Sequence, residues 1–137
     1  MILETSALIC VLTEEPEAEL YIRCMVSAIE PLTMSTGSFL ETSNVLERKG
    51  NQNAVAELDI FIARAKILLL PFTESQARIA RDCFRQFGKG SGHPAQLNFG
   101  DCFALALSLE TGEPLLYKGD DFRWAGVRNA LDDFIAR

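Results

Sequence analysis

Short apolar runs alternate with amphipathic segments along this chain, and this alternation is the strongest constraint on its fold. The runs at residues 2–3, 31–35, 67–70 and 115–117 have the length of strands, and helical patterns separate them. Strands that alternate with helices form a parallel sheet with helices on both faces. We therefore predict a single α/β domain over residues 1–137, with a central parallel sheet of four to five strands.

Residue types at the segment ends predict where the helices begin and end. The predicted N-caps are Thr5 or Ser6 for a helix over residues 7–13, Thr36 for residues 37–49, and Thr73 with Gln76, a T-x-x-Q capping box, for a helix that ends near Gly88. Further helices are predicted up to about residue 29, at 51–65, at 101–109 and at 130–135. The wholly apolar run at 67–70 is typical of a strand covered on both faces.

Composition limits the protein class. The 137 residues are 48% hydrophobic, enough for one core. The 19 acids and 13 bases give a net charge of -6, which argues against binding nucleic acid over a broad basic surface but leaves room for a local basic track. The four cysteines lack C-x-x-C spacing, so we expect reduced, buried thiols. No apolar run reaches membrane-spanning length, and the expected location is the cytoplasm.

Acidic residues adjoin four of the apolar segments. Glu4 follows the first run, Glu41 lies in the first turns of a helix, Asp101 opens another helix, and Asp120 and Asp121 follow the last run. A carboxylate in apolar surroundings is unfavourable unless it is paired, hydrogen-bonded or bound to a cation. Since ligands of parallel sheets lie beyond the carboxyl ends of the strands, these acids can converge on a hard divalent metal. The alternative is four separate surface acids that stabilise helix N-termini.

Four sequence motifs together carry a family resemblance. They are Ile2-Leu3-Glu4-Thr5-Ser6-Ala7-Leu8, Ser38-Phe39-Leu40-Glu41-Thr42, Asn98-Phe99-Gly100-Asp101-Cys102-Phe103-Ala104 and Leu115-Leu116-Tyr117-Lys118-Gly119-Asp120-Asp121-Phe122. In order and spacing they resemble the motifs of PIN-domain ribonucleases of the VapC toxin type, and the resemblance covers essentially the whole chain. It implies a Mg2+- or Mn2+-dependent endoribonuclease, the toxin of a toxin–antitoxin pair.

The resemblance also assigns roles to individual residues. It implies that Glu4, Glu41, Asp101 and Asp121 form the catalytic site, and that Glu4, Asp101 and Asp121 hold the metal, with Asp120 as the alternative to Asp121. Thr5 or Ser6 would orient the first acid. The implied partners are an RNA substrate, a cognate VapB-like antitoxin and a second copy of the chain in a homodimer. A groove beside Leu20, Tyr21 and Cys24 would suit a helix of the antitoxin.

Glu4 departs from the family pattern, which normally has Asp at this position. Glu keeps the charge but extends it by one methylene, about 1.5 Å, and Mg2+ demands near-ideal octahedral geometry. A second function therefore stays open: a catalytically attenuated PIN-fold module that binds antitoxin and RNA. A phosphatase or phospho-receiver fits less well, because Ser6 occupies the second position of the Asp-x-Asp pattern that those proteins have after the first strand.

Two other groups of residues are assigned a place in the fold, and the first of them also has a possible function. Arg78, Arg81, Arg85 and Lys89 fall on one helix face, as a solvated surface or as a track for an RNA backbone. Phe39, Phe99 and Phe103 are predicted to lie in the core.

Overall fold

The sheet is parallel and small. The structure, a computed structural model, describes residues 1–50 and 52–137. Within these residues the strands are β1 (Ile2–Leu3), β2 (Thr33–Ser35), β3 (Leu68–Leu70) and β4 (Leu115–Leu116). Their order across the sheet is β3-β2-β1-β4, and every neighbouring pair is parallel. The predicted α/β class with a parallel sheet is therefore confirmed, at four strands.

Helices connect and flank these strands. They are α1 (Thr5–Leu12), α2 (Ala18–Val26), α3 (Thr36–Arg48), α4 (Gln52–Arg64), α5 (Glu74–Phe87), α6 (Asp101–Thr111), α7 (Asp121–Trp124) and α8 (Ala130–Ile135). The predicted start of the fourth helix at Asn51 lies outside the described residues. The short helix α7 was not predicted, because four residues are too few to show helical periodicity. Among the described residues, every helix falls short of the length and apolar character needed to cross a membrane.

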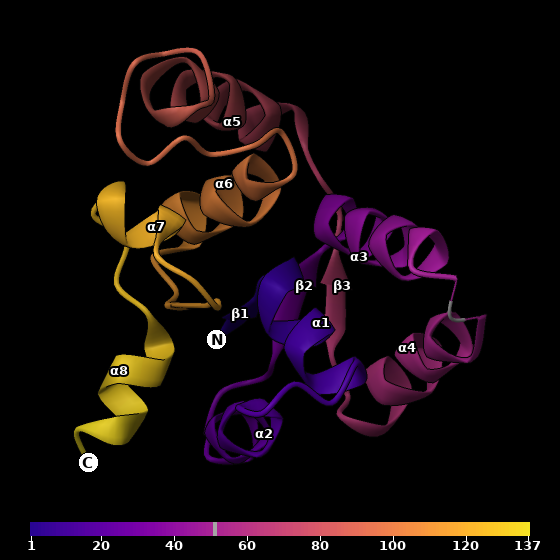
Figure 1. Cartoon of the computed structure of the whole chain (residues 1–137). Coiled ribbons are helices and arrows are strands. Elements are labelled where there is room, and N and C mark those ends of the chain that lie inside the picture. Colours follow the sequence, from indigo (N-terminus) through magenta and orange to yellow (C-terminus); the bar gives the residue numbers. More distant parts are fainter. Residues whose placement is uncertain (51) are drawn as a thin grey trace.

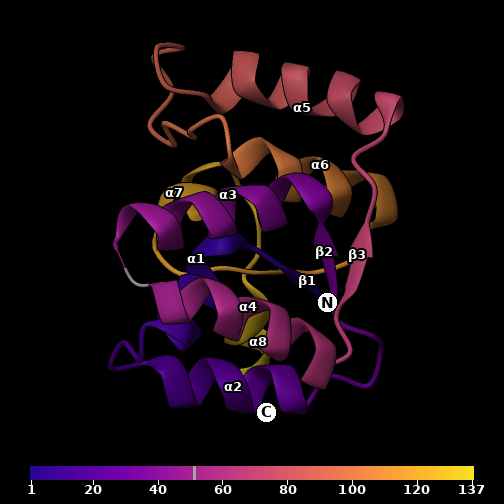
Figure 2. The same ribbon diagram turned by 90° about the vertical axis from the view of Figure 1, so that its right-hand side faces the viewer.

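The two faces of the sheet are covered by different helices. Because successive strand residues point to opposite faces, Leu3 and Leu116 pack in one buried cluster with α1, α2, α4 and α8, whereas Ile2 and Leu115 pack in another with α5, α6 and α7. Figure 1 shows α5 and α6 on one side of the sheet and α2 and α4 on the other, and Figure 2 keeps this separation after a quarter turn. Helix α3 lies between the two groups and contacts both α4 and α6.

The strand order creates a crevice between β1 and β4. The chain passes from β1 to β2 to β3 in one direction and then returns to place β4 on the other side of β1. In parallel sheets a ligand binds at such a switch point, beyond the carboxyl ends of the strands. Glu4 N donates to Leu116 O at 3.0 Å, and Lys118 N donates to Ser6 Oγ at 2.9 Å. These bonds join the two strand ends at the place where Glu4 emerges.

The segment after β4 is anchored by a buried asparagine. Asn129 Nδ2 donates to Tyr117 O at 2.7 Å, and Asn129 Oδ1 accepts from Tyr117 N at 3.3 Å and from Leu131 N at 3.2 Å. Tyr117 Oη donates to Val127 O at 2.6 Å. Because buried polar groups that lose a partner are costly, this network holds the loop between β4 and α8, which carries Asp120 and Asp121, against the sheet.

Two predicted N-caps are wrong by one residue. Helix α1 begins at Thr5 and is capped by Glu4, whose side chain accepts from Ser6 N. Helix α3 is capped by Ser35, whose Oγ accepts from Gly37 N at 3.2 Å. Serine, threonine and acidic side chains can all accept this bond. The choice among neighbouring candidates depends on where the preceding strand ends.

The capping box on α5 is half confirmed. Thr73 Oγ1 accepts from Gln76 N at 3.1 Å, as predicted. The Gln76 side chain does not complete the box, because its Nε2 donates to Glu110 Oε2 of α6 at 2.8 Å. The partner helix α6 therefore takes the side-chain bond that an isolated helix would have kept for itself.

The strand β3 is less covered than its composition predicts. It lies at an edge of the sheet, and its Leu68 and Leu69 are 51% and 37% exposed. The prediction of a strand covered on both faces is therefore wrong. An apolar run shows that a segment can be buried, but the strand order decides whether helices reach it. The four cysteines are buried as free thiols, the state that their spacing predicted.

Candidate active site

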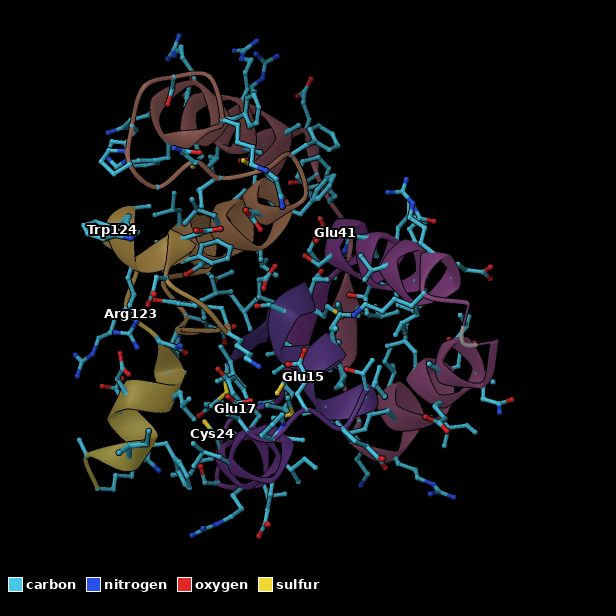
Figure 3. The ribbon with its side chains drawn as sticks, in the orientation of Figure 1. Glu15, Glu17, Cys24, Glu41, Arg123 and Trp124 are labelled. Atoms are coloured by element: carbon cyan, nitrogen blue, oxygen red, sulfur yellow. The ribbon has the colours of Figure 1, made fainter. Side chains whose placement is uncertain are left out.

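Three of the predicted acids line one cleft at the crevice between β1 and β4. The cleft has a volume of about 340 Å³, and Glu4, Glu41 and Asp101 line it from α1, α3 and α6 together with Ser6 and Asn98. In Figure 3 the Glu41 side chain extends from α3 toward α6. Side chains separated by up to 97 positions in the sequence, from residue 4 to residue 101, therefore meet in one place.

Glu4 is a buried carboxylate that caps the helix following it. Its exposed fraction is 2%, and its Oε2 accepts from Ser6 N at 2.7 Å and from Ser6 Oγ. The pKa of Glu4 is raised to about 7: burial and the charges of Asp101 and Glu41 raise it, and the bonds from Ser6 partly offset this rise. The side chain is thus folded back onto its own helix, and one oxygen already has two donors.

Asp101 is fixed by a reciprocal pair of hydrogen bonds at the start of α6. Asn98 N donates to Asp101 Oδ2 at 2.8 Å, and Asp101 N donates to Asn98 Oδ1 at 2.9 Å. The pKa of Asp101 is raised to about 6: burial and the charges of Glu41 and Asp121 raise it, and the bond from Asn98 and the charge of Lys89 partly offset this rise. Two buried carboxylates with raised pKa values in one cleft are characteristic of a functional site.

Asp121 lies within electrostatic reach of Asp101, whereas Asp120 faces Arg123. Asp121 is the exposed first residue of α7, and its charge is among the causes that raise the pKa of Asp101. Asp120 Oδ1 instead lies 3.8 Å from Arg123 Nε, and its side chain is 80% exposed. The structure brings Glu4, Glu41 and Asp101 into the cleft wall, whereas Asp121 stands outside that wall but within electrostatic reach.

The acids do not converge as tightly as the ligands of a closed metal site. In the described part of the chain, the group of three or more ligand atoms within 4.8 Å of one another is Cys10, Glu15 and Glu17. That group already faces a cation, because Lys118 Nζ lies 2.6 Å from Glu15 Oε2 and 3.0 Å from Glu17 Oε2. The labelled Glu15 and Glu17 lie close together in Figure 3. The wider spacing of the candidate acids suits Mg2+, which keeps several waters and binds few carboxylates directly.

The predicted supporting residues have different partners. Ser6 contacts Glu4 through both its N and its Oγ. Thr5 Oγ1 instead donates to Ser38 O at 3.3 Å and accepts from Thr42 Oγ1 at 3.1 Å, which ties α1 to α3. Ser6 is therefore placed to orient the first acid, whereas Thr5 holds the helix that carries Glu41.

The four basic residues that were predicted to share one helix face differ in their surroundings. Arg78 and Arg85 pair with acids of their own helix, at 3.6 Å from Glu74 and 2.9 Å from Asp82. Arg81 lines a pocket between α5 and α6, and the charge of Lys89 lowers the pKa of Asp101. Of these four cations, Lys89 therefore lies within electrostatic reach of the candidate site.

Gly100 is a site residue that the sequence interpretation missed. A Cβ atom built on Gly100 would overlap the Glu41 carboxylate, so the carboxylate occupies the space that a side chain would fill. Its backbone has φ -65°, which any residue adopts. The sequence signal that could have identified it is a glycine directly before an acid at the start of a helix. Its meaning depends on α3, which lies far away in the sequence.

Gly100→Ala is expected to lower activity with little loss of stability. The added methyl group displaces the flexible end of Glu41 and leaves the backbone unstrained, so the free energy of unfolding should change by less than about 1 kcal/mol. Cleavage of RNA should fall about 10-fold, because a small misplacement of a reacting group is costly. Urea unfolding and cleavage rates measure the two effects, with Glu41→Gln as the matched variant. A parent-like rate would show that the position of Glu41 is unimportant.

The raised pKa of Glu4 predicts a pH-dependent stability in the absence of divalent cations. The folded pKa of about 7 exceeds the ordinary value of 4.5, so the folded state holds a proton that the unfolded state releases. This stability is fully present below pH 4.5 and is lost as pH rises through 7. Relative to Glu4→Gln, the parent should lose about 3 kcal/mol of unfolding free energy between pH 4 and pH 8. Urea titrations in EDTA measure this difference, and a constant difference would contradict it.

Comparison with known proteins identifies the family of this chain. The PIN domain family model matches residues 1–127. Ribonuclease VapC28 of Mycobacterium tuberculosis is 44% identical over 132 residues, which cover 96% of this chain and 98% of that protein. Ribonuclease VapC of Mycolicibacterium smegmatis is 44% identical over 128 residues, which cover 93% and 97%.

A solved structure shares the fold. The crystal structure of Mycobacterium tuberculosis VapC20, described as a sarcin–ricin loop cleaving toxin, aligns with a TM-score of 0.76 at 16% identity, over 93% of this chain and 95% of that one. At this identity the likeness concerns the fold alone. With the family match over most of the chain and relatives above 40% identity, the protein belongs to the PIN-domain family, in its VapC ribonuclease branch.

Proposed function

We propose that this protein is a metal-dependent endoribonuclease, the toxin of a toxin–antitoxin pair, with Glu4, Glu41, Asp101 and Asp121 as its catalytic acids. The observation that carries the proposal is the pair of buried carboxylates, Glu4 and Asp101, in one cleft at the switch point of the sheet. Burial and mutual repulsion raise the pKa of both. A bound divalent cation would offset that cost. The relatives named ribonucleases support RNA as the substrate.

The residues present fit Mg2+ or Mn2+, which prefer oxygen ligands. Glu4, Asp101 and Asp121 offer carboxylate oxygens to the metal, directly or through water, and Asp120 is turned toward Arg123. When bound, the cation would supply a water of lowered pKa and neutralise charge on the phosphate. Glu41, whose carboxylate lies against Gly100, would orient the attacking water and accept its proton. Ser6 keeps the Glu4 carboxylate in place during this step.

The RNA backbone would approach along the basic residues on the same side. Lys89 lies within electrostatic reach of Asp101, and Arg78, Arg81 and Arg85 extend the track along α5. These four cations would release few counterions from the RNA, and the net charge of the protein is -6. The RNA affinity should therefore fall only moderately as the salt concentration rises.

A VapB-like antitoxin would bind the apolar groove between α2 and α4. This groove measures about 620 Å³, and its wall includes Val26, 80% exposed, and Ile29, 95% exposed. The residues predicted for it differ, because Tyr21 and Cys24 point into the core. The opposite face of α2 offers the apolar surface that a partner helix needs. The homodimer implied by the family stays a prediction.

The test is cleavage of a panel of stem–loop RNAs, including a sarcin–ricin loop, by protein treated with EDTA and then supplied with Mg2+ or Mn2+. Cleavage should require the added cation. Asp121→Asn should lower the rate about 10-fold or more, whereas the matched neighbour Asp120→Asn should stay within about threefold of the parent. Equal cleavage in EDTA would reject the metal mechanism, and the opposite ranking of the two variants would make Asp120 the fourth acid.

The attenuated module remains the second candidate, for one reason. Glu4 Oε2 already accepts two bonds from Ser6, so the longer side chain is engaged with its own helix. In that case the protein binds antitoxin and RNA without efficient cleavage, and the substitution at residue 4 discussed below decides between the two functions.

A further inference from the structure

Phe99 is an exposed aromatic ring beside the candidate acids. Its side chain is 75% exposed, although the sequence predicted it in the core. It stands between Asn98, which bonds to Asp101, and Gly100, which contacts Glu41. Leu40, 61% exposed, lines the same groove, and exposed apolar side chains that form a patch at a cleft mark an interaction site.

Neighbouring rings hold Phe99 in one orientation. It packs edge-to-face on Phe103 of α6, with centroids 5.3 Å apart and an interplanar angle of 83°. Phe103 in turn packs edge-to-face on Phe72, at 4.7 Å and 79°. Such pairs favour a defined geometry. Phe99 is therefore the outermost ring of a supported cluster, and it presents its free surface to solvent without the entropy of a loose side chain.

A groove connects this ring with the acid cleft. The groove, about 590 Å³, is lined by Phe99 and by Leu40, Asn44 and Arg48 of α3. It shares Glu41, Val45 and Asn98 with the wall of the acid cleft, so the two hollows are continuous. Beyond the ring, a second hollow of about 320 Å³ contains Arg81. The exposed ring thus stands between two arginines along a path that leads to Asp101.

We propose that Phe99 is the stacking platform for the unpaired RNA base next to the cleaved phosphodiester, an inference that rests on the proposed function. The ring offers a surface for a base. Asn44 lines the same groove with an amide group for a base edge. The Asn98 side chain lines it as well; its Oδ1 accepts from Asp101 N, and within the described residues its amide NH2 has no hydrogen-bond partner. Arg48 and Arg81 lie on either side for the phosphates.

This chemistry matches single-stranded RNA better than an apolar partner. RNA loops are recognised by bases that stack on aromatic side chains and by hydrogen bonds to their edges. A purely apolar partner would leave the two amides and Arg48 unpaired in the interface. The continuity with the acids also sets the position of the base, because a strand whose phosphate reaches Asp101 must place a neighbouring nucleotide along this groove.

The test uses the whole chain with three substitutions. Phe99→Leu keeps an apolar side chain and removes the ring, and Phe99→Tyr keeps the ring. Phe84→Leu is the matched control, since Phe84 is another partly exposed ring, 38%, which lines the Arg81 hollow but not the groove that reaches Glu41. Each is made in the parent for cleavage kinetics and in Asp101→Asn protein for RNA binding with Mg2+. The probes are stem–loop RNAs with 2-aminopurine at successive loop positions.

The expected result is a selective loss with Phe99→Leu. RNA affinity should fall about 10-fold, and KM should rise more than kcat falls, because stacking contributes to ground-state binding. The 2-aminopurine quenching at the loop position next to the cut should disappear. Phe99→Tyr and Phe84→Leu should stay within about threefold of the parent.

Two outcomes would overturn the inference alone. In the first, the parent cleaves RNA and Phe99→Leu binds and cleaves as well as the parent. In the second, sedimentation shows that Phe99→Leu converts a dimer to a monomer while the RNA affinity per chain is unchanged, which would assign this surface to a second copy of the chain. If the parent neither binds nor cleaves any RNA of the panel, the proposed function fails and the inference fails with it.

Discussion

Asp101→Asn should lower RNA cleavage by roughly 100-fold or more while the protein remains folded. The substitution removes a charge that would hold the cation, in a cleft that Glu4 and Glu41 also line. It keeps the shape of the side chain, and the amide oxygen can still accept the bond from Asn98 N that fixes the start of α6. Cleavage kinetics with saturating Mg2+ or Mn2+ measure the loss.

The same substitution should stabilise the protein at high pH. Burial raises the pKa of Asp101 from 3.8 to about 6, so the ionised carboxylate costs the folded state free energy above that pH. In EDTA at pH 8, Asp101→Asn should therefore raise the free energy of unfolding by up to about 3 kcal/mol. Inactive protein that is also less stable would indicate a structural role for Asp101 instead of a catalytic one.

Glu4→Asp should raise the cleavage rate about 10-fold or more, which corresponds to about 1.4 kcal/mol in the barrier. Shortening the side chain by one methylene moves the charge by about 1.5 Å, toward the position that the family normally uses. An aspartate still accepts from the backbone N–H of the second helical residue, so the cap on α1 survives. The control is Glu4→Gln, which keeps the length, loses the charge and should lose cleavage.

The result for Glu4→Asp separates the two candidate functions. A gain in rate that Mg2+ or Mn2+ supports would identify Glu4 as an attenuating residue in a working nuclease. An unchanged or lower rate, with cleavage still present in the parent, would show that this site is adapted to glutamate. No cleavage by either protein across the RNA panel would leave the binding module as the better account.

Much of the candidate site could be predicted because its parts are local. Glu4 at a strand end and Asp101 at a helix start each stand beside an apolar segment, and four ordered motifs carry the family resemblance. Contacts between distant segments could not be predicted in this way. Whether Gly100 faces Glu41, and whether Asp120 or Asp121 acts on Asp101, depends on how α3 and α7 pack against α6.

Strand and helix periods, and charge next to apolar runs, are visible within a few residues, so the parallel α/β class, the approximate helices and the candidate acids could be predicted from the sequence alone. Three features could be seen only in the folded structure: Glu4 folds back onto Ser6, β3 is an exposed edge, and Phe99 stands outside the core. The physical reason is the same in each case. Burial and hydrogen-bond partners are set by segments that are distant along the chain, and an apolar or acidic residue has the same local pattern whether or not such a segment covers it.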